Sequence, residues 1–307
     1  MVDRSKFTIL WHSVSSHIRC YSEDTEVLTD NGWKLIKDVD TKRDLIMTLN
    51  PEDFTMEYQK PIAKYSYSYQ GKMYHINNRQ VDLLVTPLHN IFIGKHNRKK
   101  ELVWRFDIID RQSRSNFYMP KTGIWKGEEP IYYNLNGRKI PIEAFVKFLG
   151  YYLSEGYIDH SPVNSNYTVV LCQNKDNLGK FKKALEQVTP NKVYIIEDRK
   201  VAVRDKVLWK YLSKLGYSYE KFIPREIKQL SPRLLRILIE AYLEGDGTKS
   251  PLSLFTTSKR LRDDLQEIVI KAGYSSNWSI NKKSGTEAVS YTHLRAHETR
   301  HDLVCRL

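Results

Sequence analysis

The chain has 307 residues, of which 41% are hydrophobic, and this is enough for two or three compact domains with at least one sizeable core. No stretch of about 18 apolar residues occurs, and the first residues lack the apolar core and cleavage site of a signal peptide, so we expect an intracellular, cytoplasmic protein. The formal net charge of +13 favours a polyanionic partner, most often nucleic acid, although a merely basic, solvated surface has the same composition.

The region 21–95 has the pattern of an all-β segment. Short alternating runs rich in β-branched and aromatic residues are separated by turn residues such as those at 30–32. We expect strands at TEVLT (25–29), WKLI (33–36), DLIMTL (44–49), KMYHI (72–76) and LLVT (83–86). The basic stretch 95–116 is expected to connect this segment to the region that follows it.

From about Ile142 the periodicity becomes helical, and an arrangement of helix, strand and helix occurs twice. The first copy comprises 142–156, 167–173 and 177–188, and the second comprises 232–247, 252–257 and 259–273. Ser231 and Pro232 mark the start of the second long helix, since a capping residue is followed by the ring favoured in a first helical turn. Between the copies we expect a strand pair at 192–205 and a short helix at 207–216.

Both long helices carry small residues four positions apart, namely Gly150 with Ser154, and Ala241 with Gly245. This spacing makes a groove in which two helices can pack backbone to backbone. An acidic residue follows each groove, Glu155 in the first helix and Asp246 in the second. If the helices are parallel, the carboxylates meet and repel one another unless a cation joins them. Either acid alone could be a solvated helix end, but the matching pair predicts a divalent-metal site.

The segments FLGYYLSEG (148–156) and IEAYLEGDG (239–247) resemble the two motifs of the LAGLIDADG homing endonucleases, and KFIP (221–224) resembles that family's segment between the repeats. The resemblance covers about 141–288. It implies an α+β fold of two αββαββ-type repeats with an internal pseudo-two-fold axis, in a monomer that binds a long site in double-stranded DNA. It also implies that Glu155 and Asp246 bind Mg²⁺ at the scissile phosphates, and that Lys221 gives basic support to cleavage. Lys221 could equally be an ordinary surface lysine.

The segment CYSEDTEVLTDNGW, which begins at Cys20, resembles the first block of an intein. The segment LLVTPLHNIFI (83–93) resembles the second block, with Thr86 and His89 in its TxxH pattern. The resemblance implies an all-β Hedgehog/intein-type splicing domain in which Cys20 attacks the carbonyl of Arg19 and forms a thioester. Thr86 and His89 would polarise the scissile bond. Residues 1–19 would then be the N-extein, a piece of the interrupted host protein.

The C-terminal segment 297–301, HETRH, has the HExxH pattern of zinc metalloproteases. We reject that interpretation, because a third ligand is lacking and the segment AVSYTHLRAHETRHDLVCRL (288–307) resembles translated sequencing-adapter read-through. Residues 289–307 are therefore excluded from the expected fold, and the second repeat is expected to lack its final elements. We expect no function for His293, His297, His301 or Cys305. The three cysteines, Cys20, Cys172 and Cys305, form no CxxC pair and predict neither a disulfide framework nor a cysteine zinc site.

These patterns predict four segments: an N-extein at 1–19, an incomplete splicing domain with its basic connector at 20–125, an endonuclease at 126–288 and a tail at 289–307. The last two splicing blocks of the intein family are missing. One alternative is a LAGLIDADG-derived DNA- or RNA-binding protein or maturase that no longer cuts, and another is a Hedgehog-related autoprocessing domain with a basic half of different function. The host and the DNA target stay open, because specificity resides in groove contacts and DNA deformability.

Overall fold

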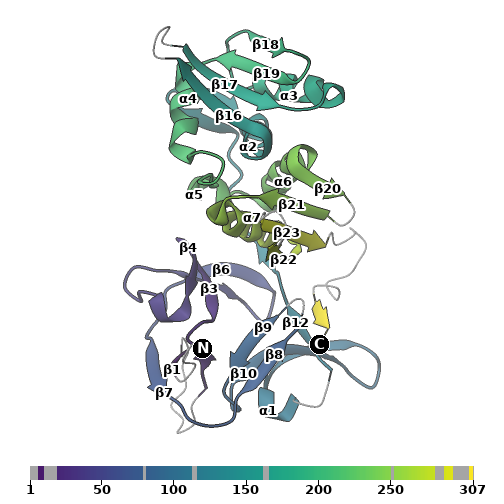
Figure 1. The fold of residues 1–307 in the computed structure, drawn as a ribbon. Coiled ribbons are helices and arrows are strands. Elements are labelled where there is room, and N and C mark those ends of the chain that lie inside the picture. Colours follow the sequence, from purple (N-terminus) through teal and green to yellow (C-terminus); the bar gives the residue numbers. More distant parts are fainter. Residues whose placement is uncertain are drawn as a thin grey trace. The chain divides into compact units, whose positions relative to one another are not determined.

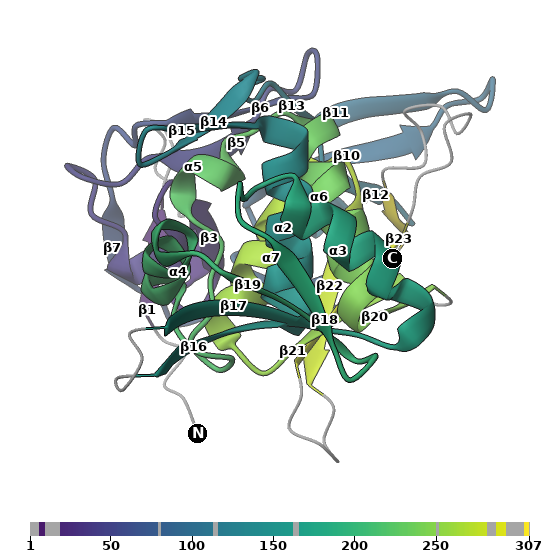
Figure 2. The same cartoon turned by 90° about the horizontal axis from the view of Figure 1, so that it is seen from above.

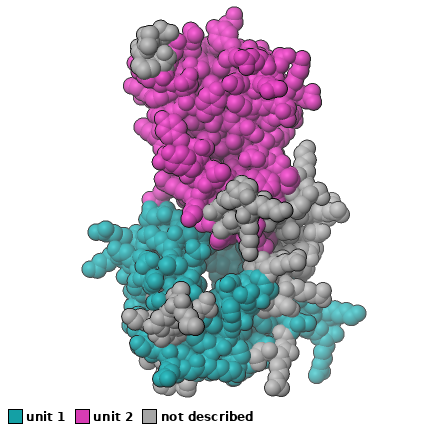
Figure 3. Space-filling model, in the orientation of Figure 1, with its two compact units in different colours: residues 1–126, 294–307 teal, residues 127–293 magenta. Residues whose placement is uncertain are grey.

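The computed structural model describes residues 6–9, 19–78, 81–112, 116–161, 166–249, 252–280, 287–292 and 304–306. The chain divides into two compact units, Met1–Lys126 with Leu294–Leu307, and Gly127–His293 (Figures 1 and 3). Within the described ranges, no helix is both long enough and apolar enough to span a membrane.

The first unit consists almost entirely of strands, arranged in three sheets. One sheet has the order β7 (Tyr65–Ser68), β1 (Lys6–Ile9), β2 (Tyr21–Ser22), β9 (Asp82–Val85) and β8 (Tyr74–Asn77). The second has the order β11 (Leu102–Ile108), β10 (Asn90–His96), β12 (Tyr118–Pro120) and β24 (Val304–Arg306). The third has the order β13 (Ile124–Trp125), β6 (Thr55–Gln59), β5 (Ile46–Leu49), β3 (Glu26–Thr29) and β4 (Gly32–Leu35). The short helices are η1 (Ile36–Asp38) and α1 (Ile109–Gln112).

The five strands expected in 21–95 are all present, with ends shifted by at most two residues. The expectation that 95–116 is a connector is wrong, because β10 and β11 form a hairpin that pairs over seven residue pairs. The strand LVWRFDI alternates apolar and polar side chains only from Trp104 to Ile108, and the charged residues that flank it made the sequence resemble a basic linker. One core of the unit gathers at the root of this hairpin, where the fully or nearly buried side chains are Val85, Ile91, Ile93, Ile109 and Phe117.

The second unit contains two copies of one αββαββ arrangement. The first copy comprises α2 (Ile142–Glu155), β16 (Gly156–Ser161), β17 (Asn166–Cys172), α3 (Leu178–Glu186), β18 (Val193–Ile196) and β19 (Lys200–Arg204). The second comprises α6 (Pro232–Asp246), β20 (Gly247–Lys249), β21 (Leu252–Thr256), α7 (Lys259–Lys271), β22 (Ser275–Ile280) and β23 (Glu287–Thr292). The sheet orders are β16-β17-β19-β18 and β20-β21-β23-β22, so corresponding strands take corresponding places.

Shorter elements accompany the two copies. A hairpin of β14 (Tyr132–Leu135) and β15 (Arg138–Pro141) precedes α2, and η2 (Lys175–Asn177) precedes α3. The helices α4 (Lys206–Leu212), η3 (Ser213–Leu215) and α5 (Arg225–Lys228) lie between the copies in sequence. Ser231 caps α6 as predicted, since its Oγ accepts a hydrogen bond from the amide of Leu234 at 3.4 Å.

The second copy is more complete than the sequence predicted. Residues 289–292 were expected to lie outside the fold, but they belong to β23, which pairs with both β21 and β22. Without β23 these two strands would each expose an unpaired edge. Residues 304–306 likewise form β24 and pair with β12. His293, His297 and His301 lie outside the described residues.

Candidate functional sites

The small residues of α2 and α6 face one another, as the sequence predicted. A β-carbon added at Gly150 would lie 2.6 Å from the carbonyl oxygen of Leu238 and 2.7 Å from the β-carbon of Ala241. A β-carbon added at Gly245 would lie 2.8 Å from the β-carbon of Ser154. Gly150, the earlier small residue of α2, contacts Ala241, the earlier small residue of α6, and Ser154 contacts Gly245 in the same way. The two helices therefore run parallel, and Figure 2 shows them side by side. Their C-terminal ends therefore meet.

Glu155 is the last residue of α2, and Asp246 is the last residue of α6. Burial raises the pKa of Glu155, the nearby charge of Asp246 raises it further, and the ammonium of Lys221 opposes both effects. Asp246 is exposed as a whole residue, yet partial burial of its carboxyl raises its pKa as well. The two carboxylates thus lie within electrostatic reach at the end of the helix seam, where the sequence placed them.

The donor chemistry of this pair fits a hard divalent cation that is shared with a substrate. Magnesium ions commonly use one or two protein carboxylates and complete their coordination with water and substrate phosphates. In the ranges covered by the structure, no group of three or more His, Cys, Asp or Glu side chains could hold a metal ion. The pair therefore suits Mg²⁺ with a phosphate ligand better than a closed structural site of protein ligands alone.

Lys221 lies beneath the end of α2 and is only 5% exposed. Its Nζ donates hydrogen bonds to the carbonyl oxygens of Tyr152 at 2.7 Å, Leu153 at 3.2 Å and Gly156 at 2.7 Å. Burial lowers the pKa of Lys221 to about 8, against the opposing charge of Glu155. A lysine ammonium has three donors, and all three are used here. Lys221 therefore caps the helix that carries Glu155, and its predicted part in cleavage stays a prediction.

Glu244 is a further residue at this centre that sequence reasoning missed. Its carboxylate accepts hydrogen bonds from the hydroxyl of Tyr151 and, at 3.0 Å, from Nζ of Lys180. Both donors belong to the first copy, whereas Glu244 belongs to the second. The contact therefore ties the end of α6 to the first copy, two residues before Asp246. A glutamate inside a motif gives no sequence signal for such a partner.

The face of the first sheet opposite Val169, Val201 and Val203 carries aromatic and basic side chains. Tyr157 and Tyr194 stand in one row across the strands and are 41% and 48% exposed. Lys200 and Arg204 of β19 flank that row on the same face. Exposed tyrosines with interleaved cations are suited to nucleic-acid backbones and bases.

Cys20, in the first unit, is fully buried and hydrogen-bonded to Thr86, 66 residues away in sequence. The amide of Cys20 donates to Oγ1 of Thr86 at 2.9 Å, and the amide of Thr86 donates to the carbonyl oxygen of Cys20 at 3.1 Å. A turn through Pro87 brings His89 back, because the amide of His89 donates to the carbonyl oxygen of Thr86 at 3.0 Å. The structure thus brings the three predicted residues together, while their roles stay predictions.

The electrostatics of this centre favour neutral groups. Burial raises the pKa of Cys20 to about 11, and burial lowers the pKa of His89 to about 4, against the opposing effect of the Arg19 backbone. The Arg19 backbone is close enough to influence the pKa of His89. Neither ring nitrogen of His89, however, makes a hydrogen bond of regular geometry to the part of the chain that the structure describes. The ring of Tyr21 packs edge to face on His89, with centroids 4.2 Å apart. A neutral imidazole is therefore held next to the Arg19–Cys20 bond.

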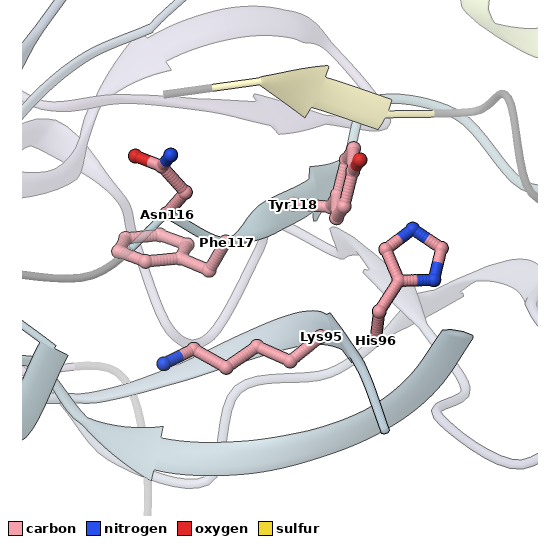
Figure 4. Close-up of a pocket in the computed structure, with 5 residues that line it drawn as sticks. All are labelled: Lys95, His96, Asn116, Phe117 and Tyr118. Carbon is pink, nitrogen blue, oxygen red and sulfur yellow. The ribbon is translucent and has the colours of Figure 1, made fainter. Parts of the chain in front are cut away.

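A separate pocket of about 250 Å³ lies beside the end of β10 that is nearest the tip of the β10–β11 hairpin. It is lined by Lys95, His96, Asn116, Phe117 and Tyr118, as Figure 4 shows. None of the site residues predicted from the sequence belongs to it.

Comparison of the sequence with curated proteins gives two distant relatives with unrelated names. The chain is 26% identical over 296 residues to an ATP-dependent Clp protease proteolytic subunit of Chlamydomonas moewusii, covering 86% of this chain and 29% of that protein. It is 26% identical over 337 aligned positions to a DNA-directed RNA polymerase subunit beta C-terminal section of Stigeoclonium helveticum, covering 90% of this chain and 30% of that protein. The chain thus spans less than a third of either relative. No protein-family model matches it.

Among solved structures, the chain is similar to mesophilic variants of the homing endonuclease I-DmoI. The sequence identity is 18%, the alignment covers 49% of this chain and 83% of that chain, and the TM-score is 0.41. I-DmoI in complex with DNA and Mn is similar at 17% identity, 49% of this chain, 90% of its own and a TM-score of 0.41. The homing endonuclease I-WcaI bound to its DNA recognition sequence is similar at 16% identity, 50% of this chain, 76% of its own and a TM-score of 0.34. Similarities of this size do not by themselves assign an activity.

Proposed function

We propose that the second unit is a divalent-metal-dependent endonuclease of the LAGLIDADG type that cuts both strands of DNA. The observation that carries this proposal is the acid pair. The long helices of the two copies, α2 and α6, end side by side in Glu155 and Asp246, and the charges of these two carboxylates repel one another. Such an arrangement is costly unless a cation joins the carboxylates. The net charge of +13 and the tyrosines and cations on the first sheet further support a polyanionic substrate.

The residues of the chain divide the work at this centre. Glu155 and Asp246 would hold Mg²⁺, which when bound supplies activation of water and neutralisation of charge on the phosphate. Lys221 holds the end of α2 through three carbonyl oxygens, and Glu244 holds the end of α6 through Tyr151 and Lys180. The two carboxylates are thereby kept in place while substrate binds. Tyr157, Lys200 and Arg204 would contact the nucleic acid.

The test is cleavage of a library of double-stranded oligonucleotides, from which cut sequences are recovered with Mg²⁺ present. Asp246→Asn and Glu155→Gln should each lower the cleavage rate by about 10³-fold or more, because a transition-state charge loses its stabilisation. Glu240→Gln is the matched control, since Glu240 is an exposed carboxylate on the same helix that lies off the seam. Full activity of Asp246→Asn would refute the metal site. Tight DNA binding by the wild type without any cutting would instead favour the alternative of a binder or maturase.

For the first unit we propose an intein-type N–S acyl shift at Cys20. Cys20 Sγ would add to the carbonyl carbon of Arg19, the Arg19–Cys20 C–N bond would break, and the thiol proton would end on the freed amine of Cys20. The contacts of Cys20 with Thr86, and the neutral imidazole of His89, support this step. A further support is that a protease subunit and a polymerase subunit share the same segment over less than a third of their lengths. A segment inserted into unrelated hosts would give this distribution.

Thioester formation can be trapped with excess thiol or hydroxylamine. The wild-type chain should release a peptide that ends at Arg19, and Cys20→Ala should release none, as measured by mass spectrometry. Circular dichroism of both chains shows whether each is folded. Equal yields from two folded chains would rule out Cys20 as the nucleophile and leave the nuclease proposal untouched.

A further inference from the structure

The tip of the β10–β11 hairpin is the one basic motif of the sequence analysis that neither proposed activity uses. Residues 95–101 carry four cations and one carboxylate. Arg98, Lys99 and Lys100 are all exposed, and no carboxylate among the described residues lies within ion-pair distance of them. The carboxylate of Glu101 is engaged elsewhere, since it accepts a hydrogen bond from Nδ2 of Asn97 at 2.8 Å. The tip thus presents three cations to solvent.

The turn at the tip is fixed by its own backbone and by Asn97. Oδ1 of Asn97 accepts hydrogen bonds from the amides of Lys99 at 2.8 Å and Glu101 at 3.0 Å, and the amide of Lys100 donates to the carbonyl oxygen of Asn97 at 3.0 Å. Nδ1 of His96 donates to the carbonyl oxygen of Lys100 at 2.9 Å. None of these bonds uses the side chains of residues 98, 99 or 100. The cations are therefore held out by a turn that does not need them.

The ribbon below the tip is braced as well. Phe92, Trp104 and Phe106 pack along one face: the ring of Phe92 stacks on Trp104 with centroids 5.6 Å apart, and it lies tilted against Phe106 with centroids 5.1 Å apart. A β-carbon at Gly94 would lie 3.1 Å from Trp104, so glycine lets the indole lie flat on the strand. The ring of His96, which lines the 250 Å³ pocket in Figure 4, packs edge to face on Tyr118 of β12. Holding a rigid ribbon costs less entropy on binding than ordering a basic loop.

We infer that this tip is a second DNA contact of the protein, in which Arg98, Lys99 and Lys100 bind the phosphate backbone of a duplex. A two-stranded ribbon has the width that a DNA groove admits, and unpaired cations gain from counterion release on binding phosphates. Phe106, 59% exposed on the ribbon, adds apolar surface for a sugar or base edge. The inference rests on the proposed function for the choice of DNA as partner.

The test is binding of a mixed-sequence duplex of about 30 base pairs, followed by fluorescence anisotropy from about 50 to 200 mM salt with chelator present. The triple variant Arg98→Gln, Lys99→Gln, Lys100→Asn removes the three charges; asparagine suits the positive φ of 63° at position 100. The control variant Lys42→Gln, Arg43→Gln, Lys60→Gln removes three exposed cations from the same unit. Circular dichroism and thermal unfolding report on folding, and the single variant Lys99→Gln gives a milder change.

The tip variant should reduce the slope of log affinity against log salt by about 2 to 3, and affinity near 100 mM salt should fall about tenfold or more. Lys99→Gln should reduce the slope by about one, and the control variant should change it by less than that. Equal slopes for tip and control variants would overturn the inference while the proposed nuclease function stands. Absence of duplex binding by the wild type at low salt would overturn both. Tip-dependent binding to anionic lipid vesicles without a matching loss on duplex DNA would overturn the choice of partner.

Discussion

Cys20 and its partners are buried and uncharged, whereas Glu155 and Asp246 are charged and partly open to solvent. At the first centre, burial raises the pKa of the Cys20 thiol, and burial together with the charge of Arg19 lowers the pKa of the His89 imidazole, so both groups favour their neutral forms. At the second, burial also disfavours charge, but each acid faces the other across a helix seam and Lys221 offsets only part of the repulsion. The first centre therefore favours neutral groups, whereas at the second the repulsion between the acids is only partly offset within the described chain, as our proposal of a bound cation requires.

The difference between the two centres fits the activity that we propose for each. An acyl shift moves one proton within a closed site, so neutral groups held without water are suited to it. Phosphodiester cleavage develops charge on a substrate that arrives from solvent, so an open pair of carboxylates with a cation is suited to that task. Breaking the packing that holds each centre should therefore produce separate and recognisable effects.

The largest effect on stability is expected at Gly150, whose added β-carbon would meet the backbone of Leu238. Because backbone cannot move aside cheaply, Gly150→Ala should lower the free energy of unfolding of the second unit by about 3 kcal/mol. Gly245→Ala should cost less, about 1 to 2 kcal/mol, because the Oγ of Ser154 can rotate away although the Cβ of Ser154 at 2.8 Å must shift with its helix. Urea unfolding measures both, and release of the Arg19-ended peptide should be unchanged.

Gly179→Ala is the control for this pair, because a β-carbon there meets nothing within 4 Å. It should raise stability by about 0.5 to 1 kcal/mol through helix propensity in α3. If Gly150→Ala were as harmless as Gly179→Ala, the two long helices would not be in backbone contact, and the acids would lose the seam that places them.

The next effect concerns the neutral centre and its response to acid. The folded pKa of His89, about 4, lies below its ordinary value of 6.5, so the unfolded chain binds the extra proton between these values. The contribution of neutral His89 to the free energy of unfolding is therefore fully present above pH 6.5 and is lost as the pH falls toward 4. Between pH 6.5 and 4.5 the loss from His89 should be about 2 to 3 kcal/mol. Between these two pH values, the free energy of unfolding of His89→Asn, measured by urea titration, should fall by about 2 to 3 kcal/mol less than that of wild type. Parallel curves for the two chains would mean that His89 is not buried as a neutral ring.

The sequence was sufficient for features that depend on local spacing. Small residues at Gly150, Ser154, Ala241 and Gly245 predicted the helix seam, because positions four apart share one helix face. The TxxH pattern predicted that Thr86 and His89 act with Cys20, and the structure places them together. Strand β16 was missed because GYIDHS shows no clean alternation of apolar residues.

Features that depend on distant contacts were not readable in this way. Lys221 has the same local sequence whether its ammonium reaches a phosphate or, as here, three carbonyl oxygens at the end of α2 and the start of β16, 65 to 69 residues earlier. Residues 289–292 were excluded from the expected fold because 288–307 resembles translated sequencing-adapter read-through, but they pair with β21 and β22 as part of strand β23. β22 directly precedes β23, but β21 lies about 30 residues earlier in the chain, so only the assembled sheet shows that β23 fills the place between them.

The smallest expected effect tests whether the carboxylates of Glu155 and Asp246 lack a neutralising partner within the metal-free protein. The folded pKa of each acid is raised, so the pair destabilises the metal-free protein at pH 7, and this cost fades as the pH falls toward the ordinary carboxyl range. The double variant Glu155→Gln, Asp246→Asn should therefore be more stable than wild type at pH 7. The gain should be only about 0.5 kcal/mol, or about 1 to 2 °C in Tm, because solvent screens these carboxylates. The difference between the two chains should shrink at pH 5, and comparing them at each pH cancels the contribution of His89.

Adding Mg²⁺ should stabilise wild type and Glu240→Gln but not the double variant, since only a folded acid pair binds the ion. A double variant less stable than wild type without metal would mean that protein donors already satisfy the two carboxylates, and the centre would then not be waiting for a cation.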